Sequence, residues 1–380
     1  MTIFFLYLRT GGGHLAPAKA ISSYIENKYS GSHETVLVDG LEGASPFARY
    51  FLEDGYRILQ SRAKWYFEFV YALNKIIPVA RLNTWLASLF IKPILKKRIL
   101  AEQPEKIVVL HFLLIKPTYA VLKECGLDIP VITIVTDPYT AHPMWFLNKY
   151  QQFVVFSERL KQHCLKLGIP EERIQVFPFI LAEKFSSPLP PTEVVETKRR
   201  LGFSVEKKLV LILGGGDGIP RGEAILSHLL PAVANAEIAI VCGKNQSLKH
   251  AAEHSRQNAN AHLKVLGYVD YIYDLINCAD VVVTKCGAST FMEILMLGKI
   301  PVVTDFIWEQ EKGNVEFIEE NELGFYEHDL QKLPGLVNRL LTDEQFYRKY
   351  KSNIEKANLR IGTIEVAEWI LNASRSNIEN

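Results

Sequence analysis

Two glycine turns, each directly after an apolar run, most strongly constrain what this chain can fold into. Residues 11–13 are Gly-Gly-Gly and follow the apolar residues 3–8, and residues 214–216 repeat this arrangement after residues 209–213. A strand that ends in glycines and leads into a helix brings bare backbone close to a ligand and points helix N–H groups at it. The two turns therefore predict two α/β halves that face each other across a cleft.

Short apolar runs alternate with helical patterns along the chain. The runs are continuously apolar, which is typical of parallel strands that are covered on both faces of the sheet. Strands are predicted at residues 3–8, 35–38, 106–111, 131–135, 153–156 and 174–176, and then at 209–213, 237–241, 263–265, 281–284 and 300–303. The βαβα order predicts an α/β fold of two doubly wound, Rossmann-like domains, with ligands outside the carboxyl ends of the strands.

A polar, proline-rich segment that begins at residue 186 marks the boundary between these domains. We expect an N-terminal domain over residues 1–185, a linker over 186–206 and a C-terminal domain over 207–380, with the last helix free to pack back on the N-terminal domain. A chain of 380 residues is long enough for two such domains. Its formal net charge of +1 gives no field that would attract nucleic acid, so no nucleic-acid partner is expected.

The cysteines and the N-terminus limit the cellular setting. The five cysteines are scattered and form no Cys-x-x-Cys pair, so neither a disulfide framework nor a zinc site is predicted, and no metal is expected. No basic region precedes the first apolar run, so no signal peptide is predicted. No run reaches about 18 apolar residues, so no transmembrane helix is predicted either.

Polar side chains follow two predicted strands of the first half. His14 follows the first glycine turn, where an imidazole that titrates near neutral pH can take or share a proton. Asp137 follows the strand at 131–135, where a partly buried carboxylate can act as a general base. His142 and Trp145 come next and either line a binding site or pack a domain edge. The alternatives for His14 and Asp137 are an exposed turn histidine and an Asx turn or helix N-cap.

The second half has its strongest local signal after the strand at 281–284. Residues 287–290, Gly-Ala-Ser-Thr, offer N–H groups and hydroxyls to a phosphate at a helix start. Glu293 lies one turn further on and can accept hydrogen bonds from two ribose hydroxyls; the alternative is a capping box with Thr290. Gln310 and Glu311 can bind sugar hydroxyls, or they begin a solvated, charged helix.

Between residues 69 and 101 the chain has no aspartate or glutamate. Basic residues are interleaved there with large apolar ones, which is typical of a segment that lies on an anionic membrane surface. Each basic residue near such a surface contributes roughly 1 kcal/mol. The residues expected to contact the membrane are Trp85, Phe90, Lys92, Lys96, Lys97 and Arg98. The alternative is a core helix with solvated lysines.

Five motifs occur in order between residues 3 and 321: Thr-Gly-Gly-Gly-His, Thr-Asp with His-Pro-x-Trp-Phe, Gly-Gly-Gly, Gly-Ala-x-Thr-x-x-Glu and Gln-Glu-x-Gly-Asn. In this order they resemble the monogalactosyldiacylglycerol synthases and processive diacylglycerol glucosyltransferases, which are inverting nucleotide-sugar glycosyltransferases of the GT-B fold. The resemblance implies that the N-terminal domain takes a lipid acceptor and touches the membrane, and that the C-terminal domain binds a UDP-sugar. It implies no metal or other cofactor.

The resemblance also implies a role for each candidate residue. Asp137 would be the base that deprotonates the acceptor hydroxyl, and His14 would orient or stabilise the groups around it. The acceptor is expected at Gly12, Gly13, His142 and Trp145. The UDP-sugar is expected at Gly215, Gly216, Gly287, Ala288, Ser289 and Thr290 through its phosphates, at Glu293 through its ribose, at Val269 through its uracil, and at Gln310 and Glu311 through its sugar.

The sequence therefore predicts a hexosyltransferase that moves galactose or glucose from a UDP-sugar to 1,2-diacylglycerol. It is expected on the cytoplasmic face of a membrane as a peripheral protein in contact with anionic lipids. Three alternatives stay open. These are a polyprenyl-linked or other lipid acceptor, a GT-B-fold UDP-sugar 2-epimerase that needs no acceptor, and a non-catalytic protein that binds a lipid or a sugar nucleotide.

Overall fold

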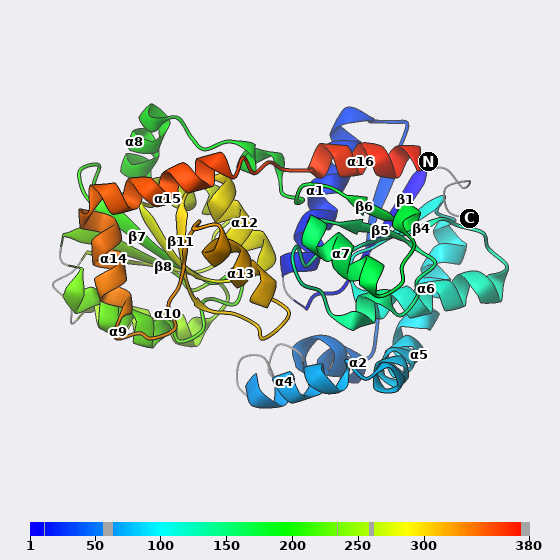
Figure 1. Cartoon of the computed structure of the whole chain (residues 1–380). Coiled ribbons are helices and arrows are strands. Elements are labelled where there is room, and N and C mark those ends of the chain that lie inside the picture. Colours follow the sequence, from blue (N-terminus) through cyan, green and yellow to red (C-terminus); the bar gives the residue numbers. More distant parts are fainter. Residues whose placement is uncertain (11, 56–63, 234, 258–261, 374–380) are drawn as a thin grey trace. The chain divides into compact units, whose positions relative to one another are not determined.

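The computed structural model describes residues 1–10, 12–55, 64–233, 235–257 and 262–373 (Figure 1). The chain divides into two compact units. The N-terminal unit contains Met1–Ala182 and the segment that starts at Ile361, and the C-terminal unit contains Glu183–Arg360. Each unit is built around its own parallel sheet.

The sheet of the N-terminal unit has six strands in the order β2-β1-β3-β4-β5-β6. They are β1 (Thr2–Tyr7), β2 (Glu34–Asp39), β3 (Lys106–Val109), β4 (Val131–Ile134), β5 (Gln152–Val155) and β6 (Ile174–Val176). All neighbouring strands are parallel, and β3, β4 and β5 are buried at every position. Since both faces of these strands are removed from water, their sequences are continuous apolar runs rather than alternating ones.

The helices of this unit include one that comes from the far end of the sequence. They are α1 (Gly12–Lys28), α2 (Pro46–Arg49), the π-helix η1 (Tyr50–Asp54), α4 (Lys64–Leu73), α5 (Ile77–Glu102), α6 (Phe112–Cys125), the 3-10 helices η2 (Pro143–Phe146) and η3 (Glu171–Arg173), α7 (Glu158–Lys166) and α16 (Thr363–Asn372). The last of them, α16, packs against α1 (Figure 1). Glu368 of α16 accepts hydrogen bonds from the hydroxyls of Tyr24 and Tyr29 and pairs with Lys28, so the end of the chain closes the N-terminal unit.

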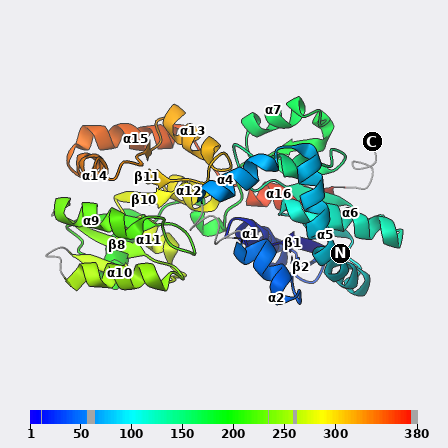
Figure 2. The same cartoon turned by 90° about the horizontal axis from the view of Figure 1, so that it is seen from below.

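The sheet of the C-terminal unit also has six strands, in the order β12-β11-β10-β7-β8-β9. They are β7 (Lys208–Leu213), β8 (Ala236–Val241), β9 (Leu263–Leu266), β10 (Val281–Lys285), β11 (Ile300–Asp305) and β12 (Phe325–Tyr326). The helices of this unit are α8 (Pro191–Arg200), α9 (Gly222–Ala232), α10 (Gln246–Gln257), α11 (Ile272–Cys278), α12 (Ala288–Met296), α13 (Lys312–Glu320), α14 (Leu333–Thr342) and α15 (Glu344–Lys356), and the 3-10 helix η4 (Glu183–Ser186) precedes them. Figure 2 shows α9 to α15 around the sheet.

The predicted α/β fold with two doubly wound sheets is confirmed, and every predicted strand is present with ends that shift by at most two residues. The sequence missed β12, which has only two residues. The segment assigned to a linker contains α8, which packs against α11. Among the described residues, no helix combines the length and the apolar character needed to cross a bilayer.

Candidate functional site

Polar side chains of the N-terminal unit meet where β1, β3 and β4 end. His14 lies in the first turn of α1, His111 precedes α6, and Thr136 follows β4. His14 Nδ1 and Thr136 Oγ1 lie 2.9 Å apart and share a hydrogen bond. The rings of His14 and His111 meet edge to face with their centroids 4.6 Å apart. The structure thus places His14 beside the residue that precedes Asp137.

Both of these histidines are uncharged at neutral pH. Burial lowers the pKa of His14 to about 4, although a hydrogen bond to the Leu110 carbonyl acts in the opposite direction. Burial also lowers the pKa of His111 well below 6.5, and the neighbouring His14 adds to this effect. His111 Nδ1 accepts a hydrogen bond from Leu113 N–H at 3.2 Å and so caps α6, which leaves the ring proton on Nε2.

Trp145 holds the carboxylate of Asp137. Its Nε1–H donates to Asp137 Oδ2 at 3.2 Å. The indole is fully buried and packs against Phe112 and His14, with ring centroids 5.7 and 6.4 Å away. Asp137 itself is only 7% exposed. A carboxylate that accepts a hydrogen bond from a packed indole has a defined orientation.

His142 is also a buried support of this region. Its Nδ1 accepts a hydrogen bond from Met144 N–H at the start of η2, and its ring lies edge to face on Tyr71 with centroids 4.3 Å apart. Contact of His142 and Trp145 with an acceptor stays a prediction; in the structure both side chains are buried, and both pack against Phe112. Sequence reasoning missed His111, although a histidine after a strand is the same signal that marked His14.

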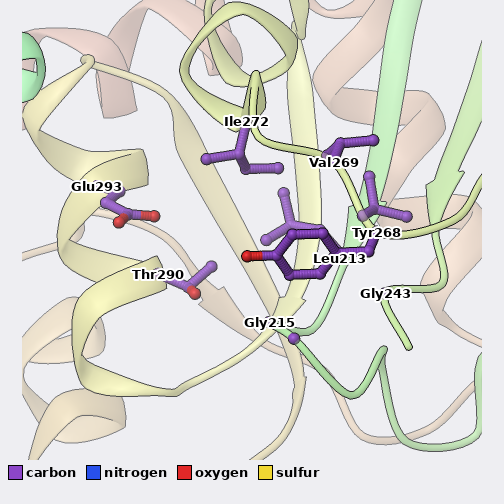
Figure 3. A pocket seen from close by; sticks show the side chains of 10 residues that line it. Leu213, Gly215, Gly243, Tyr268, Val269, Ile272, Thr290 and Glu293 are labelled. Atoms are coloured by element: carbon purple, nitrogen blue, oxygen red, sulfur yellow. The ribbon is translucent and has the colours of Figure 1, made fainter. Parts of the chain in front are cut away.

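The C-terminal unit contains a pocket of about 130 Å³ at the carboxyl ends of its central strands (Figure 3). It is lined by Leu213, Gly215, Gly216, Val241, Gly243, Tyr268, Val269, Ile272, Thr290 and Glu293. In Figure 3 the side chains of Thr290 and Glu293 on α12 lie on one side of the pocket, and Tyr268 and Val269 lie on the other. Five residues predicted to bind a nucleotide sugar therefore share this pocket: Gly215, Gly216, Val269, Thr290 and Glu293.

The glycines in the turn after β7, and Gly243 after β8, are of two kinds. A Cβ on Gly214 would lie 2.3 Å from Ile219 Cα, and one on Gly243 would lie 2.3 Å from the Gly216 carbonyl oxygen. Gly214 is required because its own loop folds back against it at Ile219, and Gly243 is required because the loop after β8 packs against the glycine turn. At Gly215 and Gly216, by contrast, a Cβ would meet nothing within 4 Å, so their backbone is bare beside the pocket. Gly243 was missed because it stands alone in the sequence, after β8.

The glycines of the first turn are open in the same way. A Cβ on Gly12 or on Gly13 would meet nothing within 4 Å. The protein itself therefore does not require glycine at these two positions, in contrast to Gly214. Gly11, the first glycine of this turn, lies outside the described residues.

The start of α12 leaves its N–H groups to other partners. Its N-cap is Gly287, and no side chain caps the helix. The alternative considered from the sequence, a capping box with Thr290 as the N-cap, is not formed, because Thr290 is already the third residue of the helix. Ser289 Oγ is buried and has no hydrogen-bond partner among the described residues. Ala288 and Ser289 thus lie in the first turn of α12, beside the pocket residue Thr290.

Glu293 lines the pocket, and the pKa of its carboxyl is raised. Burial raises the pKa of this carboxyl from 4.5 to about 7, and the charge of Lys184 lowers it slightly. Near neutral pH the group therefore changes between a neutral acid and a carboxylate. The ionised form accepts hydrogen bonds through both oxygens.

Gln310 and Glu311 lie on the loop between β11 and α13 and are not part of the pocket lining. Glu311 Oε2 accepts a hydrogen bond from Ile307 N–H at 2.7 Å, and Glu311 Oε1 lies 4.0 Å from Lys285 Nζ. A Cβ on Gly287 would lie 3.6 Å from the same Oε1. The loop is therefore next to the start of α12.

Large apolar side chains are exposed on α2, η1, α4 and the first half of α5. The aromatic ones are Phe47, Tyr50, Phe51, Trp65, Tyr66, Phe69, Trp85 and Phe90. Phe47 stacks on Phe51 with centroids 6.3 Å apart and lies 6.4 Å from Phe90. We call these three side chains the Phe47 cluster. The sequence predicted the exposure of Trp85 and Phe90. It missed residues 47–51, because the prediction was based on the stretch without acidic residues, which begins only at residue 69.

The basic residues of α5 are mostly paired within the N-terminal unit. Lys92 and Lys96 both contact Glu124 of α6. Arg98 pairs with Glu42 at 2.6 Å and with Glu102. Lys97 is exposed. Membrane contact by these four residues stays a prediction, and three of them already neutralise carboxylates of this chain.

Two family models match the chain. Residues 14–178 match the model for monogalactosyldiacylglycerol (MGDG) synthase, and residues 209–360 match the glycosyltransferase family 28 C-terminal domain. The first match contains His14, Asp137, His142 and Trp145. The second contains the whole lining of the pocket.

Relatives of two kinds align with most of the chain. A processive diacylglycerol β-glucosyltransferase from Bacillus pumilus is 25% identical over 373 residues, which cover 98% of this chain and 95% of the relative. A probable chloroplastic monogalactosyldiacylglycerol synthase from Nicotiana tabacum is 26% identical over 344 residues, 88% of this chain and 63% of the relative. The chain thus spans less than two thirds of the length of this plant relative.

Solved structures share the fold. The crystal structure of MurG from Acinetobacter baumannii matches with a TM-score of 0.61 and 13% identity, over 98% of this chain and 99% of the other. The Anabaena Alr3699/HepE structure in complex with UDP-glucose matches with a TM-score of 0.59 and 14% identity, over 98% of each chain. The fold is GT-B, and the chain belongs to the family of monogalactosyldiacylglycerol synthases and processive diacylglycerol glucosyltransferases, with a glycosyltransferase family 28 C-terminal domain.

Proposed function

We propose that this protein transfers a hexose from a UDP-sugar to 1,2-diacylglycerol and forms a β-glycosyl glycerolipid. The observation that carries the proposal is the pocket of the C-terminal unit. It combines the bare backbone of Gly215 and Gly216 with Thr290 and Glu293 of an uncapped helix start. Backbone N–H groups and a helix N-terminus suit a diphosphate, and an ionised carboxylate suits a ribose.

The diphosphate would lie against Gly215 and Gly216 and the first turn of α12, residues 287–290. Partial positive charge at the helix N-terminus stabilises negative charge there, including the charge that develops on the leaving UDP. Glu293 would accept hydrogen bonds from the ribose hydroxyls. Val269, which lines the pocket opposite α12, would pair with the uracil through its backbone.

The acceptor would bind to the N-terminal unit near Gly12 and Gly13. Asp137 would take the proton of the acceptor hydroxyl while the oxygen of that hydroxyl forms a bond to the anomeric carbon of the donor sugar. The bond from that carbon to the diphosphate breaks in the same step, and UDP leaves with the electron pair, which inverts the anomeric configuration. The hydrogen bond from Trp145 supports this role because it fixes the carboxylate. His14, neutral and bonded to Thr136, would position the groups around it.

Diacylglycerol is proposed as the acceptor because the names of both kinds of relatives refer to it. The exposed Phe47 cluster supports a lipid surface as the place where the acceptor is found. We propose that the protein works as a peripheral protein on the cytoplasmic face of such a membrane and contacts anionic lipids there through Lys97. Glucose and galactose differ only in the orientation of one hydroxyl, and the relatives include both a monogalactosyldiacylglycerol synthase and a β-glucosyltransferase. Both UDP-glucose and UDP-galactose are therefore candidate donors.

One substitution in each unit tests the proposal, through the rate of transfer in the N-terminal unit and through UDP binding in the C-terminal unit. Asp137→Asn removes the proton acceptor, so kcat should fall by roughly 10²- to 10⁴-fold while the affinity for UDP is kept. Glu293→Ala should instead weaken UDP binding. Asp128→Asn, at an exposed site of the same unit, is the matched control and should behave like the wild type. If Asp137→Asn transfers hexose at the wild-type rate, Asp137 is not the base.

A further inference from the structure

A buried glutamine lies behind the carboxylate of Asp137, outside the motifs that carry the proposed function. We infer that Gln151 is a positioning residue: its amide holds the backbone of Trp145, and the indole of Trp145 orients the carboxylate of Asp137. This inference rests on the proposed function, because Asp137 is the proposed base of the transfer.

The segment between β4 and β5, residues 135–151, carries both Asp137 and Trp145. Gln151 is its last residue, and Thr133 lies in β4 just before its start. Thr133 Oγ1 donates a hydrogen bond to Gln151 Oε1 at 2.7 Å. The end of the segment is therefore tied back to the strand from which the segment begins.

The amide of Gln151 is fully buried, and both of its ends are engaged. Its Nε2 donates to the carbonyls of Trp145 and Asn148, each at 3.3 Å. Thr133 and Gln151 are both 0% exposed. Since a carbonyl can only accept, Nε2 must face these two carbonyls and Oε1 must face Thr133. A buried amide that lost these partners would leave polar groups unpaired away from water, which is costly, so its orientation is well defined.

Trp145 carries this support to Asp137. It lies in η2, a 3-10 helix of only four residues, and such a short helix has few internal hydrogen bonds to hold its shape. Gln151 holds the carbonyl of Trp145, and Nε1–H of the same residue donates to Asp137 Oδ2 at 3.2 Å. A shift of the Trp145 backbone would therefore move the indole and turn the carboxylate.

The backbone on both sides of Asp137 is held by other contacts. Thr136 Oγ1 shares a hydrogen bond with His14 Nδ1 at 2.9 Å. Ser157 Oγ donates to the Pro138 carbonyl at 2.6 Å. The hydrogen bond from the indole acts on the side chain instead. Loss of the support from the glutamine amide should thus change the direction of the carboxylate and leave its backbone in place.

Thr133→Val tests the inference with little change in side-chain volume. It removes the donor to Gln151 Oε1, so the amide is free to turn and release Trp145. We expect kcat for hexose transfer to 1,2-diacylglycerol in vesicles to fall about ten- to a hundredfold, because a small misplacement of a catalytic group has an effect of this size. Affinity for UDP, measured by calorimetry, should stay within about twofold, since the pocket belongs to the other unit.

Two control variants accompany this substitution. Thr133→Ser keeps the hydroxyl, so its kcat should stay within about threefold of the wild type. Thr118→Val is the matched control: Thr118 is also a fully buried threonine of the N-terminal unit, but its Oγ1 donates to the Leu114 carbonyl of its own helix at 2.7 Å. This variant should transfer hexose at the wild-type rate.

The Asp137→Asn background distinguishes positioning of the base from general damage to the unit. With the base removed, Thr133→Val should change the residual kcat by less than about twofold. If Thr133→Val slows Asp137→Asn as strongly as it slows the wild type, its effect does not pass through Asp137 and the inference is wrong. A wild-type kcat for Thr133→Val overturns it as well. Should Thr133→Val fail to fold, Gln151→Asn, one methylene shorter, makes the same comparisons.

The same measurements keep the inference separate from the proposed function. If wild-type protein transfers no hexose, or if Asp137→Asn transfers it at the wild-type rate, the proposed function or its base fails and the inference falls with it. If Asp137→Asn is slow while Thr133→Val and Gln151→Asn both keep the wild-type kcat, only the inference fails.

Discussion

Glu293 shows at the residue scale how burial sets the chemistry of one side chain. Its carboxyl is buried where it lines the pocket, and this burial raises its pKa to about 7. Sequence reasoning placed this residue at a helix start but could not give its ionisation, because burial depends on neighbours from other strands. Trp145 and His142 illustrate the same limit: their motif was recognised, yet their burial, and the hydrogen bond from Trp145 to Asp137, are visible only in the fold.

This pKa predicts how the affinity for UDP depends on pH. The ionised carboxylate of Glu293 can accept hydrogen bonds from two ribose hydroxyls. The protonated form carries a hydrogen on one oxygen and therefore accepts hydrogen bonds less well. From about pH 6 to about pH 8 the ionised fraction rises from roughly a tenth to roughly nine tenths, so UDP affinity should rise by up to about tenfold. Glu293→Gln should bind more weakly and lose this pH dependence, which calorimetry at three pH values would show. The same slope in both proteins would assign the pH dependence to another group.

At the scale of elements, the strands were predictable and the surface contacts of helices were not. Each predicted strand is a continuous apolar run, and that pattern follows directly from burial on both faces. The role of α5 does not follow from its sequence in the same way. Its basic residues suggested a membrane surface, but Lys92 and Lys96 meet Glu124, which lies on another helix. Ion pairs between helices require the packed structure.

The exposed apolar side chains therefore carry the membrane prediction. Replacement of all three side chains of the Phe47 cluster by serine should weaken binding to vesicles that contain anionic lipid by at least about tenfold, since burial of one such side chain is worth about 1.5–3 kcal/mol. The loss should persist at high salt. Lys97→Ala should cause a smaller loss, of roughly 1 kcal/mol, that disappears at high salt.

Leu100→Ser is the matched control, because Leu100 is exposed on the same helix near its other end. Co-sedimentation with vesicles measures all of these variants. If the triple variant sediments like Leu100→Ser, the Phe47 cluster does not contact the membrane.

At the scale of the whole molecule, the family and the fold were predictable because five short motifs occur in a fixed order along a βαβα pattern. Relatives at about a quarter identity still align with most of the chain, and the motifs that pointed to the family here follow strands whose carboxyl ends meet at one edge of a sheet. The return of α16 to the N-terminal unit could only be left open, because packing of Glu368 on Tyr24 and Tyr29 joins opposite ends of the sequence.

The most direct test of the account is product analysis of purified protein with UDP-glucose or UDP-galactose and 1,2-diacylglycerol in vesicles. We predict UDP release that depends on the acceptor, and a glycolipid whose anomeric proton shows the β configuration by NMR. Acceptor-independent conversion of the UDP-sugar into an epimer, or no glycolipid from either donor, would contradict the proposed function.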